Sequence, residues 1–407
     1  MAKSGLTPNK HHCMVVHAHY PYGETRVQRE AEALVRHGYE VDVLCLRGTK
    51  ENATEICNGV RVIRLPVRYR NHGWIGGKFL EYLRFFLLAM VKLTWLHWQR
   101  PYPTIQLHNL PDFLVFAAWL PKLFGARVIL DLHDLMPEFY QARYGGNGNT
   151  SLPVRLIYWQ EKLACRFADH VITVSKIWRQ TLIRRGVPAD KCSVVMNVAD
   201  HTIFHQTDAP QTTHSQNGGL NLIYHGILPY RYGLDLVIRA VAQVRQQIPG
   251  IHVTIHGGGE YYPNLVALAE ELDLLDKHVY FSTRQVSLDD LPDFIRSADV
   301  GLAPYRQDVF TDGIVPTKLM EYAALGMPAI AARTTAIEAY FTDTMVEFFT
   351  PGDVDDLARC MLRLYADGEH LAQLARGADK FNQRYNWAKL SGEYVALIEQ
   401  LASQQVK

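Results

Sequence analysis

The chain has 407 residues, of which 48% are hydrophobic and 20% charged, so it can bury a large core and is not a disordered protein. Its 42 Lys and Arg residues nearly balance 41 Asp and Glu residues, for a net charge of +1, which argues against a dedicated nucleic-acid binder. The length predicts two domains, or three.

The cysteines and the first residues indicate a cellular compartment. No CxxC pair or zinc-type spacing occurs among the six cysteines, which are Cys13, Cys45, Cys57, Cys165, Cys192 and Cys360. We therefore expect reduced thiols, with neither a disulfide nor a structural zinc. Residues 1–12 are polar and do not resemble a signal peptide. These features favour a cytoplasmic protein.

The first half of the chain alternates short apolar runs with amphipathic segments. The runs predict strands at residues 11–17, 41–46, 127–133 and 170–175, and residues 27–37 before Gly38 predict a helix. This alternation is typical of a parallel sheet with helices on its faces. We expect a doubly wound α/β domain over residues 1–205.

Residues 79–98 are the most apolar stretch of the chain. Glu81, Arg84 and Lys92 interrupt it, so we do not expect it to cross a membrane. On a helical wheel these three side chains lie near one face and apolar residues fill much of the remainder. A buried helix and a helix at a membrane surface are equally good interpretations of this segment.

The flanks of this segment favour a membrane surface. Between residues 61 and 100, eight basic residues stand against the single acid Glu81. Trp74, Trp95 and Trp98 are of the type found at membrane interfaces. We expect Arg84, Lys92, Trp95 and Trp98 to contact an anionic membrane surface, and the protein to be peripheral on the inner face of the cell membrane.

The second half repeats the architecture of the first. A polar stretch at residues 207–219 has no hydrophobic period and predicts a linker. Strands are predicted at 220–225, 251–256, 279–281, 300–303 and 329–331, and helices at 234–247 and 264–272. We expect a second domain over residues 206–385.

Two kinds of motif suggest chemistry. Gly23, Gly226 to Gly233, and Gly257 to Gly259 lie where strands turn into helices, and such turns can place backbone N–H groups against a phosphate. Each alone is as well explained by ordinary loop structure.

Lys318 and Glu321 are three residues apart on a predicted helix, so both project from the same side of its first turn. A cation there can meet a diphosphate and a carboxylate can accept two sugar hydroxyls; a surface ion pair is the alternative.

Residues 316–328, Pro-Thr-Lys-Leu-Met-Glu-Tyr-Ala-Ala-Leu-Gly-Met-Pro, resemble the nucleotide-sugar motif of glycosyltransferase family 4, which are retaining enzymes. Six further blocks fall in the order of that family, at residues 20–34, 130–138, 173–175, 195–200, 224–235 and 255–259. The resemblance implies a GT-B fold with two Rossmann-like domains facing a central cleft. Residues 1–205 would bind the acceptor and 206–385 the nucleotide sugar, and a helix in 386–407 would pack back on the first domain.

The resemblance also implies site residues. Glu321 would hold the ribose hydroxyls, and Arg231 and Lys318 would stabilise the departing diphosphate without a metal. The remaining donor-side residues would be Gly23, Asn197, Gly226, Gly257, Gly258 and Thr317. Two departures stand out: Gly313 replaces the first of the family's two spaced glutamates, with Asp312 beside it, and Ile227 and Tyr232 occupy the positions of the usual diphosphate cations.

His133 is the acceptor-side catalytic candidate, because it ends a predicted strand and the resemblance places it near the transferred sugar. Asp134 follows it directly, and Glu138 is a second candidate that could equally start a helix. A lone histidine at a strand end is more often structural.

The expected reaction moves a hexose from a UDP- or GDP-linked sugar to a saccharide or polyprenyl-linked saccharide in cell-surface polysaccharide assembly, without nucleic acid. Two alternatives remain open. A non-hydrolysing nucleotide-sugar epimerase would use the same donor half without an acceptor. A non-catalytic nucleotide- or membrane-binding subunit would bind without turnover.

Overall fold

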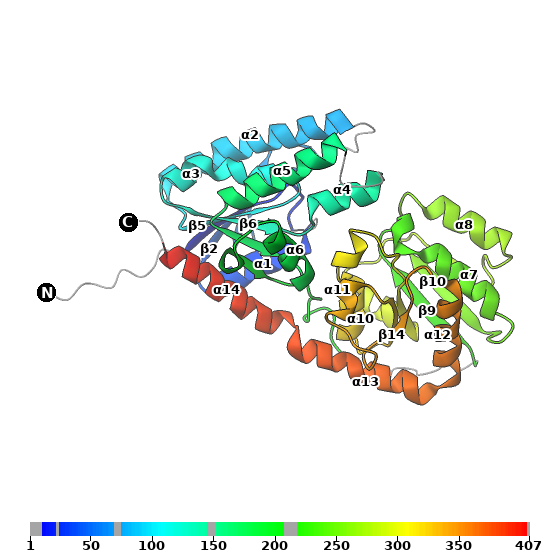
Figure 1. The fold of residues 1–407 in the computed structure, drawn as a ribbon. Helices are drawn as coiled ribbons and strands as arrows, with labels where there is room; N and C mark the ends of the chain where they lie inside the picture. Colours follow the sequence, from blue (N-terminus) through cyan, green and yellow to red (C-terminus); the bar gives the residue numbers. More distant parts are fainter. Residues whose placement is uncertain (1–9, 22–23, 69–74, 145–150, 207–217, 405–407) are drawn as a thin grey trace. The chain divides into compact units, whose positions relative to one another are not determined.

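The computed structural model describes residues 10–21, 24–68, 75–144, 151–206 and 218–404 (Figure 1). The chain divides into two compact units. The first contains Met1–Val174, Trp178–Met196 and Lys389–Lys407, and the second contains Ser175–Ile177 and Asn197–Ala388. The C-terminal segment therefore returns to the first unit.

The first unit is built on an eight-stranded sheet with the order β3-β4-β2-β1-β5-β6-β7-β8. Its strands are parallel except for the β3–β4 pair. The strands are β1 (His11–Val15), β2 (Glu40–Leu46), β3 (Thr54–Cys57), β4 (Val60–Leu65), β5 (Thr104–His108), β6 (Arg127–Leu132), β7 (His170–Thr173) and β8 (Cys192–Val194). The strand order reverses between β1 and β5, and ligands in such sheets bind at the carboxyl ends beside this point.

Helices cover both faces of this sheet. Those of the first unit are α1 (Thr25–Arg36), α2 (Ile75–Gln99), η1 (Asp112–Ala118), α3 (Trp119–Leu123), α4 (Met136–Tyr144), α5 (Leu152–Phe167), α6 (Lys176–Arg184), η2 (Ala189–Lys191) and α14 (Trp387–Ser403). Figure 1 shows α2, α3 and α5 on one face and α1 and α14 on the other. In α1, Val27, Ala31 and Leu34 recur at helical spacing and are fully buried.

The second unit is built on a parallel six-stranded sheet with the order β11-β10-β9-β12-β13-β14. Its strands are β9 (Leu220–His225), β10 (Ile251–His256), β11 (Val279–Ser282), β12 (Val300–Ala303), β13 (Ala329–Ala332) and β14 (Glu347–Phe349). The order reverses between β9 and β12. Both sheets therefore have the doubly wound, Rossmann-like arrangement that the alternating pattern predicts.

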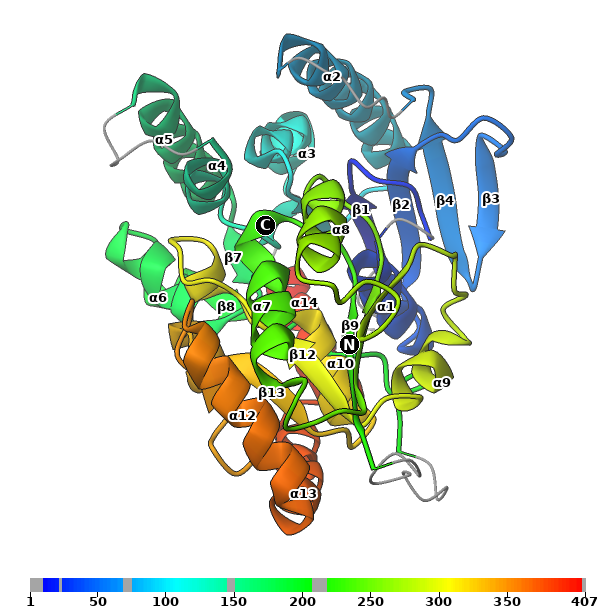
Figure 2. The same ribbon diagram turned by 90° about the vertical axis from the view of Figure 1, so that its right-hand side faces the viewer.

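The helices of the second unit are η3 (Tyr230–Tyr232), α7 (Leu234–Val244), α8 (Tyr262–Glu271), α9 (Leu291–Arg296), η4 (Thr311–Gly313), α10 (Thr317–Ala324), α11 (Thr335–Glu338), α12 (Val354–Ala366) and α13 (Gly368–Arg384). Here α7 packs beside α12 (Figure 2), and α10 packs against α13. The helix predicted to reach residue 247 ends at Val244, before Pro249, since a residue preceding proline disfavours helical backbone.

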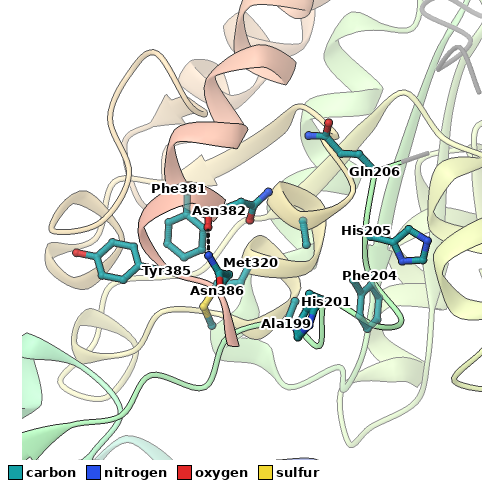
Figure 3. A pocket seen from close by; sticks show the side chains of 11 residues that line it. Ala199, His201, Phe204, His205, Gln206, Met320, Phe381, Asn382, Tyr385 and Asn386 are labelled. Carbon is teal, nitrogen blue, oxygen red and sulfur yellow. Dashed lines mark hydrogen bonds between the residues drawn. The ribbon is translucent and has the colours of Figure 1, made fainter. Parts of the chain in front are cut away.

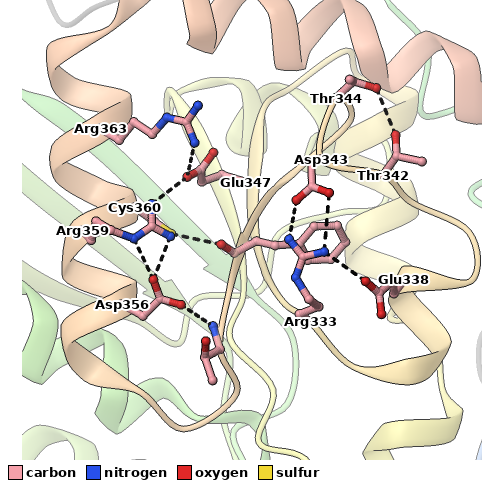
Figure 4. A network of polar contacts seen from close by, with 12 residues as sticks. Arg333, Glu338, Thr342, Asp343, Thr344, Glu347, Asp356, Arg359, Cys360 and Arg363 are labelled. Carbon is pink, nitrogen blue, oxygen red and sulfur yellow. Dashed lines mark hydrogen bonds and ion pairs between the residues drawn. The ribbon is translucent and has the colours of Figure 1, made fainter.

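A network of charges fixes the edge strand of the second sheet (Figure 4). Glu347, at the start of β14, is only 4% exposed. It accepts from Arg363 at 3.3 Å and from His370 at 2.7 Å, and Arg359 lies 3.5 Å away. These side chains come from α12 and α13, so the network ties both helices to the edge of the sheet.

The six cysteines are free thiols, five of them buried. In the part of the chain that the structure describes, no helix combines the length and the apolar character that crossing a bilayer requires.

Candidate active-site residues

In the second unit, several candidate side chains gather where the strand order reverses. His225 is the last residue of β9, and Tyr305 lies two residues beyond the end of β12. Helix α10 carries Lys318 and Glu321 in its first turns. The two side chains predicted to share one helix face thus lie beside neighbouring strand ends.

Lys318 lies inside a cage of aromatic rings. Its Nζ is 4.7 Å from the ring centre of Tyr224, 5.0 Å from that of Tyr232 and 5.1 Å from that of Tyr305. It donates to the Tyr305 hydroxyl at 2.8 Å, and the rings of Tyr232 and Tyr305 are stacked, with centres 4.2 Å apart. Burial lowers the pKa of Lys318 to about 8. Among the described residues no carboxylate lies within ion-pair distance of this ammonium, so its charge is available to an anion.

Glu321 is held by a histidine. Its Oε2 lies 2.6 Å from His225 Nε2, and His225 Nδ1 lies 3.2 Å from the Tyr322 hydroxyl. The Tyr322 hydroxyl also donates to the backbone oxygen of Ile223 at 3.2 Å, so the carboxylate, the imidazole and the hydroxyl form a hydrogen-bonded chain anchored to β9. The ring of Tyr322 packs over Gly301, where a Cβ would come within 2.4 Å of it. The Glu321 carboxylate is 19% exposed and thus retains lone pairs for further donors.

The glycines of the two predicted turns have different roles. A Cβ on Gly257 would lie 1.9 Å from the carbonyl oxygen of Gly226, so Gly257 allows two backbone turns to pack together. A Cβ on Gly226 would lie 3.7 Å from Lys318 Nζ, which places this turn against the lysine cage. A Cβ on Gly258 would meet nothing within 4 Å.

The remaining predicted donor-side residues are Arg231, Thr317, Asn197 and Gly23. Arg231 lies in η3, next to Tyr232 of the cage, with its guanidinium 5.5 Å from the ring centre of Phe310. Thr317 is exposed at the first position of α10, and Asn197 is half-buried. Gly23 lies outside the described residues.

Asp312 stands beside the position of the missing glutamate. Its Oδ1 accepts from Gln307 Nε2 at 2.9 Å and from the backbone N–H of Thr335 at 2.8 Å. The carboxylate therefore braces the start of α11, and this accounts for Asp312 structurally.

In the first unit, His133 follows the end of β6 and lies among charged and polar groups. Its Nε2 is 3.0 Å from His108 Nδ1 and 3.6 Å from Asp131 Oδ2, while its Nδ1 is 3.5 Å from Glu24. The side chain is 17% exposed. Burial alone would lower the pKa of His133, but Asp131 outweighs it and raises the pKa above its ordinary value.

Asp131 is the fully buried centre of this cluster. Arg26 donates to both of its oxygens, at 3.0 and 3.1 Å, and also lies 3.1 Å from the buried Glu30. Burial would raise the pKa of Asp131, but Arg26 and the neighbouring imidazoles hold it well below its usual range. Burial raises the pKa of Glu30 to about 7 and lowers that of His108 to about 4. Asp131 is therefore the carboxylate that balances Arg26.

Ligand atoms of His108, Asp131 and His133 lie within 4.8 Å of one another, as metal ligands would. Both oxygens of Asp131 are already engaged by Arg26. A cation placed there would meet the positive charge of that guanidinium. The donor set therefore fits a hydrogen-bonded cluster better than a metal centre.

The two other acceptor-side candidates, Glu138 and Asp134, take part in contacts that hold neighbouring helices and loops together. Glu138, in α4, pairs with Arg185, which also donates to Glu161 at 2.9 Å. The backbone oxygen of Asp134 accepts from Asn109 Nδ2 at 2.6 Å. The Asn109 amide also holds the His133 backbone N–H at 2.8 Å, so it fixes the loop that carries the histidine.

Several residues of these clusters were not singled out in the sequence, namely Arg26, Glu30, Gln106, His108, Asp131, His225 and Tyr305. A usable signal existed for His108, because it ends β5 beside β6 and pairs in register with Asp131. Parallel neighbours end at the same edge, so histidines after adjacent strands are expected to meet. Nothing in the sequence pattern marks Arg26 or Tyr305.

Helix α2 is apolar on both of its faces. Phe85, Ala89 and Leu93 are fully buried, whereas Val91 is 66% exposed and Trp98 78%. Glu81, Arg84 and Lys92 lie near one face of the α2 helical wheel, but Glu81 is buried and pairs with Lys78 at 2.7 Å. Arg84 is exposed, and Lys92 Nζ lies 4.2 Å from the ring centre of Trp95.

The local excess of basic residues is smaller than the sequence indicates. Arg61 pairs with Asp42, Arg64 with Glu51 and Glu55, and Arg100 with Glu40. Acids distant in sequence thus neutralise the flanks by strand pairing and packing. Trp74 lies outside the described residues.

A cavity of about 210 Å³ in the second unit lies on the other side of α10 (Figure 3). Met320 and Ala324, one helical turn apart, line it together with residues of the segment 199–206 and of the end of α13. None of the predicted donor residues lines this cavity. It is therefore distinct from the lysine cage.

Two family models match the chain. One describes a glycosyl transferase 4-like domain and matches residues 23–197; the other describes glycosyl transferases group 1 and matches residues 219–367. Together they cover about four fifths of the chain. The chain belongs to the GT-B glycosyltransferases.

Characterised and uncharacterised glycosyltransferases are among its relatives. An uncharacterised glycosyltransferase of Methanocaldococcus jannaschii is 24% identical, with 90% of each chain covered. The amylovoran biosynthesis glycosyltransferase AmsK of Erwinia amylovora is 26% identical over 57% of this chain and 56% of its own. A GDP-mannose-dependent mannosyltransferase of Mycolicibacterium smegmatis is 32% identical over 35% of this glycosyltransferase and 38% of its own length.

Solved structures share the fold. Sucrose-phosphate synthase from Thermosynechococcus elongatus has a TM-score of 0.79 at 20% identity and covers 97% of this glycosyltransferase and 99% of its own chain. Anabaena HepE in complex with UDP has a TM-score of 0.71 at 16% identity, covering 96% and 99%. The predicted GT-B fold is confirmed.

Proposed function

We propose that this glycosyltransferase is a retaining family 4 enzyme that moves a hexose from a UDP- or GDP-linked sugar to a saccharide or lipid-linked saccharide acceptor. The observation that carries the proposal is the unpaired Lys318 ammonium at the carboxyl ends of β9 and β12, with the Glu321 carboxylate on the same helix. A cation and a carboxylate so arranged suit a diphosphate and a ribose diol.

The chemistry assigns a role to each group. Breaking the anomeric C–O bond leaves added negative charge on the diphosphate, while the sugar ring becomes oxocarbenium-like. Lys318 and Arg231 stabilise the departing diphosphate, which in turn takes the proton of the acceptor hydroxyl. Glu321 orients the ribose, and His133 contacts the transferred sugar near the reacting carbon. We propose that these two cations balance the charge of the departing diphosphate, so that the reaction needs no metal.

The setting we propose is bacterial cell-surface polysaccharide assembly, at the cytoplasmic side of the membrane. Support comes from the likeness to AmsK, a glycosyltransferase of amylovoran biosynthesis. Free thiols throughout the chain suit a reducing compartment.

A membrane-facing surface would bring the enzyme to a lipid-linked acceptor. Large apolar side chains are exposed on α2, α3 and α5 of the first unit: Phe79, Leu80, Leu87, Val91, Trp95, Trp98, Trp119, Leu120, Leu123, Phe124, Leu152, Leu156 and Trp159. We call this set the apolar face. A groove of about 350 Å³ in it, between α2 and α3, is large enough for part of an acyl chain.

The charges around the apolar face suit an anionic surface. Arg84, Arg155, Lys162 and Arg166 are exposed on α2 and α5, whereas the acids of these helices, Glu81 and Glu161, are buried. Cations among exposed tryptophans are typical of interfacial helices.

The reaction is tested by incubating the protein with a panel of nucleotide sugars and with lipid acceptors extracted from cells. Mass spectrometry detects the product, and NMR determines the anomeric configuration of the new linkage. We expect transfer with retained configuration that persists in EDTA. Epimerised sugar without acceptor, inverted product, or nucleotide binding without turnover would each contradict the proposal.

Flotation with vesicles containing anionic lipid tests the apolar face. We expect salt-sensitive binding that Leu123→Asp and Trp98→Asp weaken. Ile56→Asp is the matched control, because Ile56 is 66% exposed on β3, away from the apolar face. Equal binding by all three variants would exclude this surface.

A further inference from the structure

A chain of buried hydrogen bonds joins the C-terminal helix to the His133 cluster. Tyr394, fully buried in α14, donates its hydroxyl proton to Gln106 Oε1 at 2.7 Å. Gln106, in the middle of β5, donates from Nε2 to Asp131 Oδ2 at 3.0 Å and to Glu30 Oε2 at 2.8 Å. Asp131 in turn faces His108 and His133.

The orientation of the Gln106 amide depends on Tyr394. An amide side chain can present either its oxygen or its NH₂ group to a neighbour. With the tyrosine hydroxyl donating to the oxygen, the NH₂ group points at the carboxylates of Asp131 and Glu30. Without that donor the amide oxygen loses its partner, and the NH₂ group that contacts Asp131 is held only by the carboxylates that it faces.

The helix that carries Tyr394 is held in place by its own apolar face. Trp387, Leu390, Val395, Ile398 and Leu401 are buried along α14, and Lys10 pairs with Glu399 at 3.1 Å. Tyr394 is therefore set by packing that is independent of His133.

We propose that Tyr394 is a positioning residue for His133 and acts through Gln106 and Asp131. This makes the C-terminal segment, which returns to the first unit, part of the support of the acceptor-side histidine. The catalytic consequence rests on the proposed function, whereas the effect on the histidine itself does not.

Several charged or titratable groups face His133 and contribute to its protonation. They are Glu24 before α1, Arg26 and Glu30 on α1, His108 on β5 and Asp131 on β6. Tyr394 touches none of them directly in the chain of bonds above; it reaches Asp131 through the amide of Gln106. A change at Tyr394 should therefore act on His133 mainly through Asp131 and, to a smaller extent, through Glu30, to which Gln106 also donates.

The experiment is a double-mutant cycle on the full-length protein without substrate. Its readout is the pH titration of the His133 imidazole by NMR. The His133 signal is identified by its loss in His133→Gln. Asp131→Asn should lower the midpoint of His133, because the carboxylate raises it. Tyr394→Phe should shift the midpoint in the wild-type background and shift it clearly less in the Asp131→Asn background, where only the route through Glu30 remains.

Tyr102→Phe is the matched control. Tyr102 is also fully buried in the first unit and donates to a buried carboxylate, Asp42, that is not joined to His133. It should leave the His133 midpoint unchanged. If Tyr394→Phe does not fold, Gln106→Met interrupts the same chain one step along and should give the same shift.

A wild-type midpoint in Tyr394→Phe, or an equal shift in both backgrounds, would overturn the proposal. In turnover, Tyr394→Phe should lower kcat about three- to tenfold without changing the KM of the nucleotide sugar, and Tyr102→Phe should not. Absence of any transfer by the wild-type protein would contradict the proposed function, yet leave the titration as a valid test of the positioning role.

Discussion

Lys318 in the second unit and His133 in the first are held in opposite ways. His133 faces three carboxylates, those of Glu24, Glu30 and Asp131, and the Arg26 guanidinium, so neighbouring side chains of its own unit set its charge. Lys318 faces three rings and the Tyr305 hydroxyl; burial desolvates its charge, the more distant Glu321 offsets this only in part, and no described carboxylate lies within ion-pair distance. A buried cation without a partner is costly unless a ligand supplies the anion. From this difference we propose that the second unit binds the anion and that residues of the first unit position His133.

The largest effect should come from Lys318→Met, which keeps the length of the side chain and removes the charge. Loss of a preorganised group at developing charge typically costs 100- to 1,000-fold, and we expect a fall in kcat of about that size. Steady-state kinetics measure it. Lys277→Met, at an exposed lysine paired with Asp273, is the control; a similar fall in both variants would remove the distinction between the two units.

Glu321→Gln should have the next largest effect. The substitution removes a charged acceptor for the ribose hydroxyls and for His225, and hydrogen bonds to charged groups contribute about 1.5–3 kcal/mol. We expect UDP or GDP to bind about 10- to 100-fold more weakly in a calorimetric titration. Glu338→Gln, at an exposed glutamate paired with Arg333, should bind as the wild type does. Unchanged affinity in Glu321→Gln would refute the ribose assignment.

The pH dependence of nucleotide binding sharpens the comparison further. Because burial places the pKa of Lys318 at about 8, the ammonium is mostly charged at neutral pH and loses its proton as the pH rises through that value. Diphosphate affinity should therefore fall by up to about tenfold per pH unit above 8. Titrations at several pH values measure this, and Lys318→Met should show no such fall. A flat profile in the wild type would contradict the account.

Tyr305→Phe should have the smallest effect. It removes the hydroxyl that accepts from Lys318 and keeps the ring that stacks on Tyr232. Loss of one hydrogen bond of about 1 kcal/mol corresponds to a change of about fivefold in nucleotide affinity. Tyr280→Phe, which loses only a bond to the Lys277 carbonyl, is the comparison. A Tyr305→Phe effect as large as that of Lys318→Met would mean that the cage, and not the ammonium, dominates binding.

The fold followed from the sequence more completely than the site did. The spacing and length of the apolar runs predict the strands, and β9, β10 and β12 have the predicted bounds. Lys318 and Glu321 were singled out because local helical spacing puts them on one face, and the resemblance to family 4 supplied their expected roles. Partners from distant elements were missed: Tyr394 reaches Gln106 across 288 positions and Arg26 reaches Asp131 across 105. Only the packed tertiary structure brings such pairs together.

The membrane prediction illustrates the same limit. Counting charges between residues 61 and 100 overstates the basic excess, because Arg61, Arg64 and Arg100 pair with acids elsewhere in the chain. The apolar face on α3 and α5 gives no strong signal in the sequence, since tertiary packing brings its residues together: α3 and η1 pack against α2, and α5 packs against η1.

The central claim is that the second unit binds the diphosphate through Lys318. Calorimetric titration of the wild type and of Lys318→Met with a nucleoside and with its diphosphate tests this claim most directly. For the wild type we expect UDP or GDP to bind far more tightly than uridine or guanosine. In Lys318→Met that preference should largely vanish while nucleoside binding persists. An undiminished preference for the diphosphate in Lys318→Met would contradict the claim.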